Sequence, residues 1–327
     1  MKVWDMHCDT LAELRYAQQA GKPKSFLHND LMMDLERMKQ GDYLLQCMAC
    51  FVHLEPEREK SPLLACLEEI DIFYRLLEQY PDDLMQVRTA ADIQTLLTSG
   101  KRGMMLTVEE GGACLDSLGA LRDLYRLGVR MMTLTWNFKN GLAEPNIVPG
   151  TDDMWPRPAN TTGGLTEKGL EFVEEMQRLH MLVDVSHLSD GGFWDCIRLS
   201  KKPIIASHSN ARALCAHPRN LSDEMLCALG ECGGVVGLNF YPQFLQSDRS
   251  AEVLDIAKHG MHILQKAGED SVALGTDFDG FEAGKNWIRG IEEIECVWDA
   301  LKKAGMTERQ LDKLSYQNVK RVLGEVL

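Results

Sequence analysis

His7 and Asp9 stand two positions apart at the end of the first apolar run, in VWDMHCDTL. An imidazole nitrogen and a carboxylate oxygen are both ligands of zinc and similar divalent ions. Alternate residues of a strand face the same way, so both side chains can point to one side while Cys8 points to the other. The pattern is short, and it indicates a metal site only if partners stand elsewhere in the chain.

Several later apolar runs end in side chains of the same kinds. They are Glu109 or Glu110 in MMLTVEEGG, His187 in LVDVSH, His208 in PIIASHS, and Asp277 and Asp279 in VALGTDFDG. One histidine at a strand end is more often a structural residue than a ligand, but the joint placement of these donors favours a metal site. The set exceeds what one tetrahedral ion needs, and a carboxylate that bridges two ions about 3.5–4 Å apart would use it most economically.

The elements that must position these donors follow from hydrophobic patterning. Eight apolar runs bounded by turn signals predict strands, and amphipathic helical patterns separate most of them. The predicted strands span residues 2–8, 43–52, 103–108, 130–135, 182–186, 203–207, 234–240 and 271–276. Alternating strands and helices indicate a parallel α/β fold, either a closed barrel or an open doubly wound sheet.

The closed arrangement, a (β/α)8 TIM-type barrel, is favoured by the count of eight strands and by the length of 327 residues. The first strand is followed by no glycine-rich dinucleotide fingerprint, which an open Rossmann sheet would carry. We therefore expect residues 1–327 to form one barrel domain, with an insertion at residues 137–164 after the fourth strand and closing helices at the C-terminus. The C-terminal strand ends of such a barrel share one face, which would bring the donors together.

Composition limits the partners. Acidic residues outnumber basic ones 49 to 35, for a net charge near −14, so we expect neither nucleic acid nor a membrane as a partner. We see no secretory signal, lipid-anchor tail or membrane-spanning run, and expect a cytoplasmic protein. The ten cysteines are spread through apolar segments, which predicts free thiols. Strand alternation would send Cys47 and Cys50 of the CxxC pattern to opposite faces.

Taken together, these stretches resemble the renal (membrane) dipeptidase family of binuclear zinc peptidases, whose barrel is amidohydrolase-like. The matching motifs are DMHCDT, VEEGG, LTLTWN, DVSH, ASHSNARALCAHPRN, VGLNFY and LGTDFDG, in family order over residues 5–280. The resemblance implies two zinc ions, one held by His7 and Asp9 and the other by His187 and His208. It also implies that Glu110 bridges both ions and that Glu109 faces away from the mouth.

The resemblance further implies substrate-binding roles for residues outside the metal set. Arg219 would hold the terminal carboxylate of the substrate, Tyr241 would line its pocket, and Asp277 would act near the amine and the scissile bond. Trp136 stands where the renal enzyme has a histidine that contacts the substrate and the developing oxyanion. An indole donates one hydrogen bond but carries no charge, so Asn137 or the zinc itself would take over that role.

The expected function is that of a zinc-dependent dipeptidase in which a hydroxide held between the metals attacks the peptide carbonyl. Asp277 would carry the proton to the leaving amine, and Arg219 would select short substrates by their carboxylate end. The family resemblance also implies a homodimer. Two alternatives stay open: a related metal-dependent amidohydrolase acting on N-acyl amino acids, lactams or lactones, and a catalytically silent metal-binding barrel.

Overall fold

Parallel strands form the centre of the molecule. The computed structural model describes residues 1–55, 58, 61–148, 157–247, 250–282, 284 and 287–327. Within these residues the strands are β1 (Val3–Asp5), β2 (Tyr43–Phe51), β3 (Leu84–Gln86), β4 (Arg102–Glu109), β5 (Met131–Thr133), β6 (Leu182–Asp184), β7 (Ile205–Ala206), β8 (Val235–Leu238) and β9 (Val272–Leu274).

Eight of these strands close into a barrel. The sheet order is β2-β1-β9-β8-β7-β6-β5-β4-β3, and a further pairing of β2 with β4 completes the ring. The pairings are parallel, and β2 and β4 are matched from Leu45↔Gly103 to Phe51↔Glu109. This confirms the predicted (β/α)8 TIM-type fold. The strand β3 was not predicted; it lies outside the ring, paired with the first residues of β4, while β5 pairs with the last ones.

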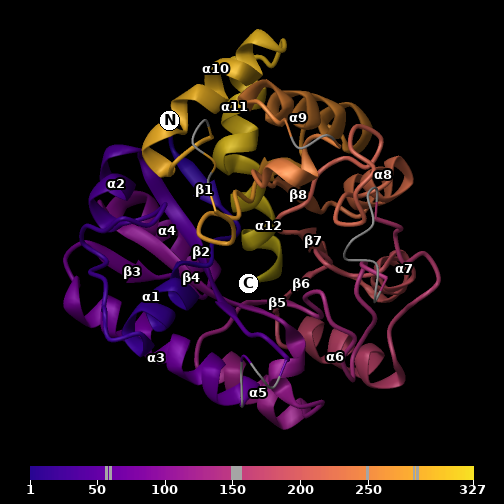
Figure 1. Ribbon diagram of the computed structural model, residues 1–327, viewed down its shortest axis with the longest axis horizontal. Helices are drawn as coiled ribbons and strands as arrows, with labels where there is room; N and C mark the ends of the chain where they lie inside the picture. The colour runs from indigo at the N-terminus through magenta and orange to yellow at the C-terminus, as the bar shows by residue number, and fades with distance from the viewer. Residues whose placement is uncertain (56–57, 59–60, 149–156, 248–249, 283, 285–286) are drawn as a thin grey trace.

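Most of the helices lie around the outside of the ring of strands (Figure 1). The helices are α1 (Thr10–Gln19), α2 (Leu35–Gln40), α3 (Pro62–Gln79), α4 (Ala90–Ser99), α5 (Leu118–Arg126), α6 (Glu167–Arg178), α7 (Asp190–Leu199), α8 (Asp223–Glu231), α9 (Val253–Ala267), α10 (Glu295–Lys303), α11 (Glu308–Asp312) and α12 (Asn318–Val326). Hydroxyl side chains fix several starts: Ser117, Ser189 and Ser222 each accept a hydrogen bond from a backbone N–H of the first helical turn.

An apolar inner core fills one end of the barrel. Cys47 of β2 and Met105 of β4 enter it together with Met6, which follows β1, and Val322 and Leu323 of α12 pack against them. Figure 1 shows α12 behind the middle of the ring of strands. The predicted closing helix is therefore present, and it leaves the opposite end, where the strands terminate, open for a site.

The two cysteines of the CxxC pattern lie on opposite faces of β2. Cys47 lies in the inner core while Cys50 lies in the outer core between strands and helices, so the two sulfurs face opposite ways, as predicted. Every cysteine is a free thiol. Among the described residues, no helix is long and apolar enough to cross a membrane. Residues 149–156 of the predicted insertion lie outside the described residues.

Candidate metal centre

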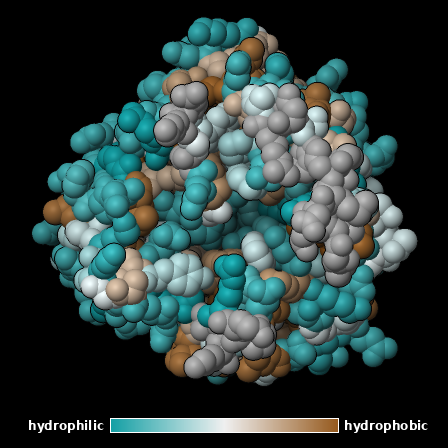
Figure 2. Space-filling model, in the orientation of Figure 1, coloured by the Kyte–Doolittle hydropathy of each residue, from teal (hydrophilic) through white to brown (hydrophobic). Residues whose placement is uncertain are grey.

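The C-terminal ends of the barrel strands surround a cavity of about 690 Å³. Figure 2 shows the face as hollowed near its middle, with hydrophilic residues prominent in the hollow. Side chains from loops after many of the strands line this cavity, among them Asp9, Glu109, His187, Arg219 and Asp277. Asp9, His187, Arg219 and Asp277, which were all predicted site residues, therefore meet at one mouth, as expected of a barrel.

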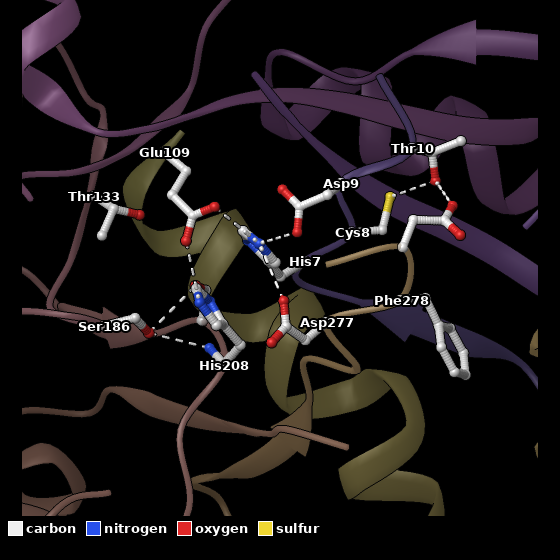
Figure 3. Close-up of polar contacts among 12 residues, drawn as sticks. His7, Cys8, Asp9, Thr10, Glu109, Thr133, Ser186, His208, Asp277 and Phe278 are labelled. Atoms are coloured by element: carbon white, nitrogen blue, oxygen red, sulfur yellow. Dashed lines mark hydrogen bonds and ion pairs between the residues drawn. The ribbon is translucent and has the colours of Figure 1, made fainter. Parts of the chain in front are cut away.

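Six residues with possible ligand atoms converge at the floor of the mouth. Figure 3 shows five of them, His7, Asp9, Glu109, His208 and Asp277, and the sixth is His187. Three overlapping groups have ligand atoms within 4.8 Å of one another: His7, Asp9 and Glu109; Glu109, His187 and His208; and His7, His208 and Asp277. The Nε2 atom of His7 lies 3.4 Å from Asp9 Oδ2 and 3.5 Å from Glu109 Oε2. Oε1 of Glu109 lies 3.0 Å from His187 Nε2 and 3.3 Å from His208 Nε2.

A break in the first strand aims His7 and Asp9 at the cavity. Trp4 and Met6 belong to the inner core, so continued alternation would send His7 outward. Regular pairing of β1 ends at Asp5, and after the break His7 and Asp9 face the mouth while Cys8 packs outward, 3.6 Å from the sulfur of Met48. The predicted orientation of these three side chains is confirmed, although the strand is shorter than expected.

The two adjacent glutamates after β4 have roles opposite to those predicted. Glu109 carries the central carboxylate, whereas Glu110 belongs to none of the donor groups. Glu110 adopts φ 90°, and its carboxylate accepts hydrogen bonds from the backbone N–H groups of Gly112 (2.7 Å) and Trp136 (2.8 Å). The structure therefore does not bring Glu110, the predicted bridging ligand, to the cluster: its oxygens accept from backbone donors, and Glu109 lies among the histidines instead.

His187 and His208 are oriented by partners at their far ring nitrogens. The amide oxygen of Asn137 lies 2.8 Å from His187 Nδ1, and because this oxygen can only accept, the proton sits on Nδ1. Ser207 donates to Asp184, so its oxygen accepts from His208 Nδ1 at 2.7 Å. Both Nε2 atoms therefore present lone pairs, 3.0 Å apart. Two facing lone pairs beside a carboxylate repel one another unless they share a cation.

Unpartnered buried atoms show that the residues fit a metal centre. His7 Nε2 and Asp9 Oδ1 are buried and have no hydrogen-bond partner among the described residues. A buried polar atom without a partner is costly, and a bound cation would satisfy both of these atoms. Mixed imidazole and carboxylate ligands suit zinc and similar divalent ions.

The charges around the cluster agree with this fit. Burial lowers the pKa of His7, but the charges of Glu109 and Asp9 outweigh it and hold that pKa well above its usual range. Burial and the charge of Arg219 lower the pKa of His187 to about 3, so this imidazole is neutral. Glu109 and Asp9 therefore favour a positive charge at the cluster, and the neutral imidazole of His187 offers a lone pair there.

Asp277 and Asp279 follow β9 and differ in position. Asp277 Oδ1 lies 3.7 Å from His7 Nε2, and Oδ2 accepts from Asn239 Nδ2 at 2.9 Å. Burial raises the pKa of Asp277 to about 7. The Asp279 carboxylate instead accepts from Thr10 Oγ1 (2.6 Å) and the Met32 backbone N–H (2.7 Å). Asp277 is thus the carboxyl that reaches the cluster, while Asp279 ties two loops together.

Arg219 and Tyr241 line the same cavity. Arg219 is buried, and its Nη2 donates to the backbone oxygen of His208 at 3.0 Å. Its Nε and Nη1 atoms are buried with no hydrogen-bond partner among the described residues. Burial lowers the pKa of Arg219 to about 10, so the guanidinium stays charged at neutral pH. An anionic ligand group in the cavity would supply the missing partners.

Trp136 and Asn137 lie between the cluster and the rim. The Trp136 ring is 6.0 Å from the His187 ring and 5.1 Å from that of Phe51. Asn137 lines the cavity, but its amide oxygen is occupied by His187. This orienting contact was not predicted from the sequence, and neither were those of Asp184, Ser207 and Asn239. Asp184 lies in the motif DVSH and Ser207 in ASHS, and these polar strand ends were the signal that could have indicated the two residues.

The parallel barrel and the donors at its mouth place the chain among TIM-barrel metallohydrolases. The sequence profile of the membrane dipeptidase family (peptidase family M19) matches residues 1–327. The chain belongs to this family and is a hydrolase. It is 36% identical over 304 residues to an uncharacterized dipeptidase of Schizosaccharomyces pombe, an overlap of 88% of this chain and 71% of the relative.

Solved structures agree with the family assignment. A metallopeptidase from Rhodobacter sphaeroides, liganded with a phosphinate mimic of the dipeptide L-Ala-D-Ala, is similar with a TM-score of 0.89 and 26% identity over 100% of this chain and 99% of that chain. A dipeptidase of the same peptidase family gives 0.88 and 27% over the same shares. Both likenesses extend over the whole barrel.

Proposed function

We propose that the protein is a zinc-dependent dipeptidase with two ions at the mouth of the barrel. His7 and Asp9 would hold one ion, and His187 and His208 the other. Glu109 would lie between them, because its two carboxylate oxygens face different histidines. This placement of Glu109 is the single observation that carries the proposal.

Ions bound there would lower the pKa of a water to about 7 and polarise the peptide carbonyl. Asp277 would move the proton: Asn239 holds its Oδ2, and its Oδ1 lies 3.7 Å from His7 Nε2. A positioned carboxyl of this kind can accept a proton from the attacking water and give it to the leaving amine. Asp277 is therefore our catalytic acid and base.

Arg219 would bind the C-terminal carboxylate of the substrate. Its two unpartnered nitrogens can form the paired hydrogen bonds that a guanidinium makes with a carboxylate. A clamp that holds the carboxylate end in the same cavity as the cluster would position a short substrate by its end, which favours dipeptides over proteins. The dipeptide mimic bound to the Rhodobacter relative supports this substrate class. Tyr241 would contact the same residue of the substrate, and Trp136 would contact its other half.

The test is a panel of L-L and L-D dipeptides, N-acyl amino acids, lactams and lactones, assayed with zinc and again with chelator. We expect zinc-dependent cleavage of dipeptides. In the same panel Asp277→Asn should lower kcat by about 10²-fold or more, the usual contribution of a general acid or base, and should keep near-normal zinc content. Cleavage of acylated amino acids alone, or of no compound, would contradict the proposal.

A further inference from the structure

An aromatic wall stands on one side of the mouth. We define it as Phe51, His53 and Trp136, with Phe138 packed behind. Ring centroids are 5.1 Å apart for Phe51 and Trp136, 5.4 Å for His53 and Trp136, and 5.2 Å for Trp136 and Phe138. The three residues of the wall proper line the cavity. Asp9 and Asp277 line the same cavity and are acidic. The wall is the largely apolar part of the cavity lining, distinct from these carboxylates.

The wall is held by β2 and by the segment after β5, and these two strands flank β4, which carries Glu109. Phe51 pairs in register with Glu109 across β2 and β4. Cys47 on β2 faces the inner core, so alternation turns Phe51 toward the mouth, directly above that core. Trp136 is fixed by its backbone N–H, which donates to Glu110 at 2.8 Å. The rings are therefore built into the site and do not hang from a loose loop.

The position of the wall in the ring matters for the direction of a bound substrate. In the eight-stranded ring, β2 lies four strands from β7 whichever way one counts. Arg219 is tied to the end of β7 through the backbone oxygen of His208. A ligand that reaches from Arg219 across the metal donors thus points its far end toward the end of β2.

We propose that the aromatic wall is the subsite for the side chain of the amino-terminal residue, and that it selects an apolar or aromatic side chain. The inference rests on the proposed function, which puts the carboxylate at Arg219 and the cleaved carbonyl at the cluster. The amino-terminal α-carbon is then bonded to that carbonyl, and its side chain starts beside Trp136, whose ring is 6.0 Å from that of His187. Burying an apolar side chain against these rings stabilises the bound state.

The test compares kcat/KM of the zinc-loaded enzyme for Gly-Ala, Leu-Ala and Phe-Ala, in the alanine configuration that is cleaved. We expect Leu-Ala and Phe-Ala to exceed Gly-Ala about tenfold or more, since a few methylenes in an apolar pocket discriminate by that order. Phe51→Ala should bring this ratio close to one, mainly by raising KM for Leu-Ala and Phe-Ala. Phe51→Leu keeps an apolar side chain and should retain most of the preference for Leu-Ala.

The matched control is Phe281→Ala, which removes the same ring from the other side of the mouth, where Phe281 lies 5.5 Å from Tyr241. It should leave the ratio unchanged. Equal rates for the three dipeptides, or an equal fall of the ratio in both alanine variants, would overturn the inference alone. A preference for Lys-Ala or Arg-Ala that Glu13→Gln abolishes would give the subsite to Glu13, which also lines the cavity. Cleavage of no dipeptide by the unmodified enzyme would overturn the proposed function and this inference with it.

Discussion

At the scale of single residues, Glu109 and Glu110 show that a shift of one position along a strand changes which side chain faces the inside of the barrel. The motif VEEGG contains both, and the family resemblance did not identify the inward one correctly. The alternation of β4 carries that information: Met105 faces the inner core, and Glu109 lies two alternations further on. Glu110 then turns back at positive φ toward backbone donors. By contrast, His7, Asp9, His187 and His208 meet at the cluster, as the sequence predicted.

This exchange of roles predicts different outcomes for two matched variants. Glu109→Gln should remove most of the bound zinc and the activity, because the central charge and one of the two carboxylate oxygens are lost. Glu110→Gln should keep the zinc and lower the free energy of unfolding by about 1–3 kcal/mol, since an amide NH2 would face backbone donors. Metal analysis gives the zinc content of both variants, and denaturant unfolding gives their free energies of unfolding. Zinc loss in the Glu110 variant alone would restore Glu110 as the bridging ligand.

At the scale of elements, two buried aspartates explain why the strands end earlier than their apolar runs. Asp5 accepts from the backbone N–H groups of His7 (3.3 Å) and Thr276 (3.0 Å). Asp184 does the same for Ser186 (3.0 Å) and Ser207 (2.9 Å). Carboxylates thus replace the backbone ladder at the mouth and free the next residues to turn inward. Hydrophobic patterning predicts the strands but carries no signal for this replacement, and it is too weak for the three-residue β3.

The contact from Asp184 through Ser207 to His208 predicts the effect of losing one hydroxyl. Ser207→Ala removes the acceptor that keeps the proton on His208 Nδ1, and should weaken zinc binding about 10–100-fold. Ser209→Ala is the control, because it removes a nearby hydroxyl that contacts the Ser186 hydroxyl (3.4 Å), whereas Ser207 Oγ contacts His208 Nδ1. Competition with a chromogenic chelator measures both affinities. Equal affinities in the two variants would show that the Ser207 contact does not orient the ligand.

At the scale of the whole molecule, the apolar core that stabilises the barrel and the polar residues of the site lie at opposite ends. The inner core and α12 fill one end with apolar side chains, and the polar donors gather at the other. The strand count, the parallel order and the face that carries the site were predictable because each follows from patterning and from the rules of parallel barrels. The path of the insertion after β5 could not be predicted, because its polar loops carry no periodic signal. The homodimer stays a prediction.

The central claim is that two zinc ions share Glu109 at this mouth. The most direct measurement is a titration of metal-free protein with zinc, with bound metal and dipeptide hydrolysis followed together. We expect tight binding of two equivalents per chain, with full activity reached only as the second site fills. Saturation and full activity at one equivalent, or full activity in the metal-free protein, would contradict the account.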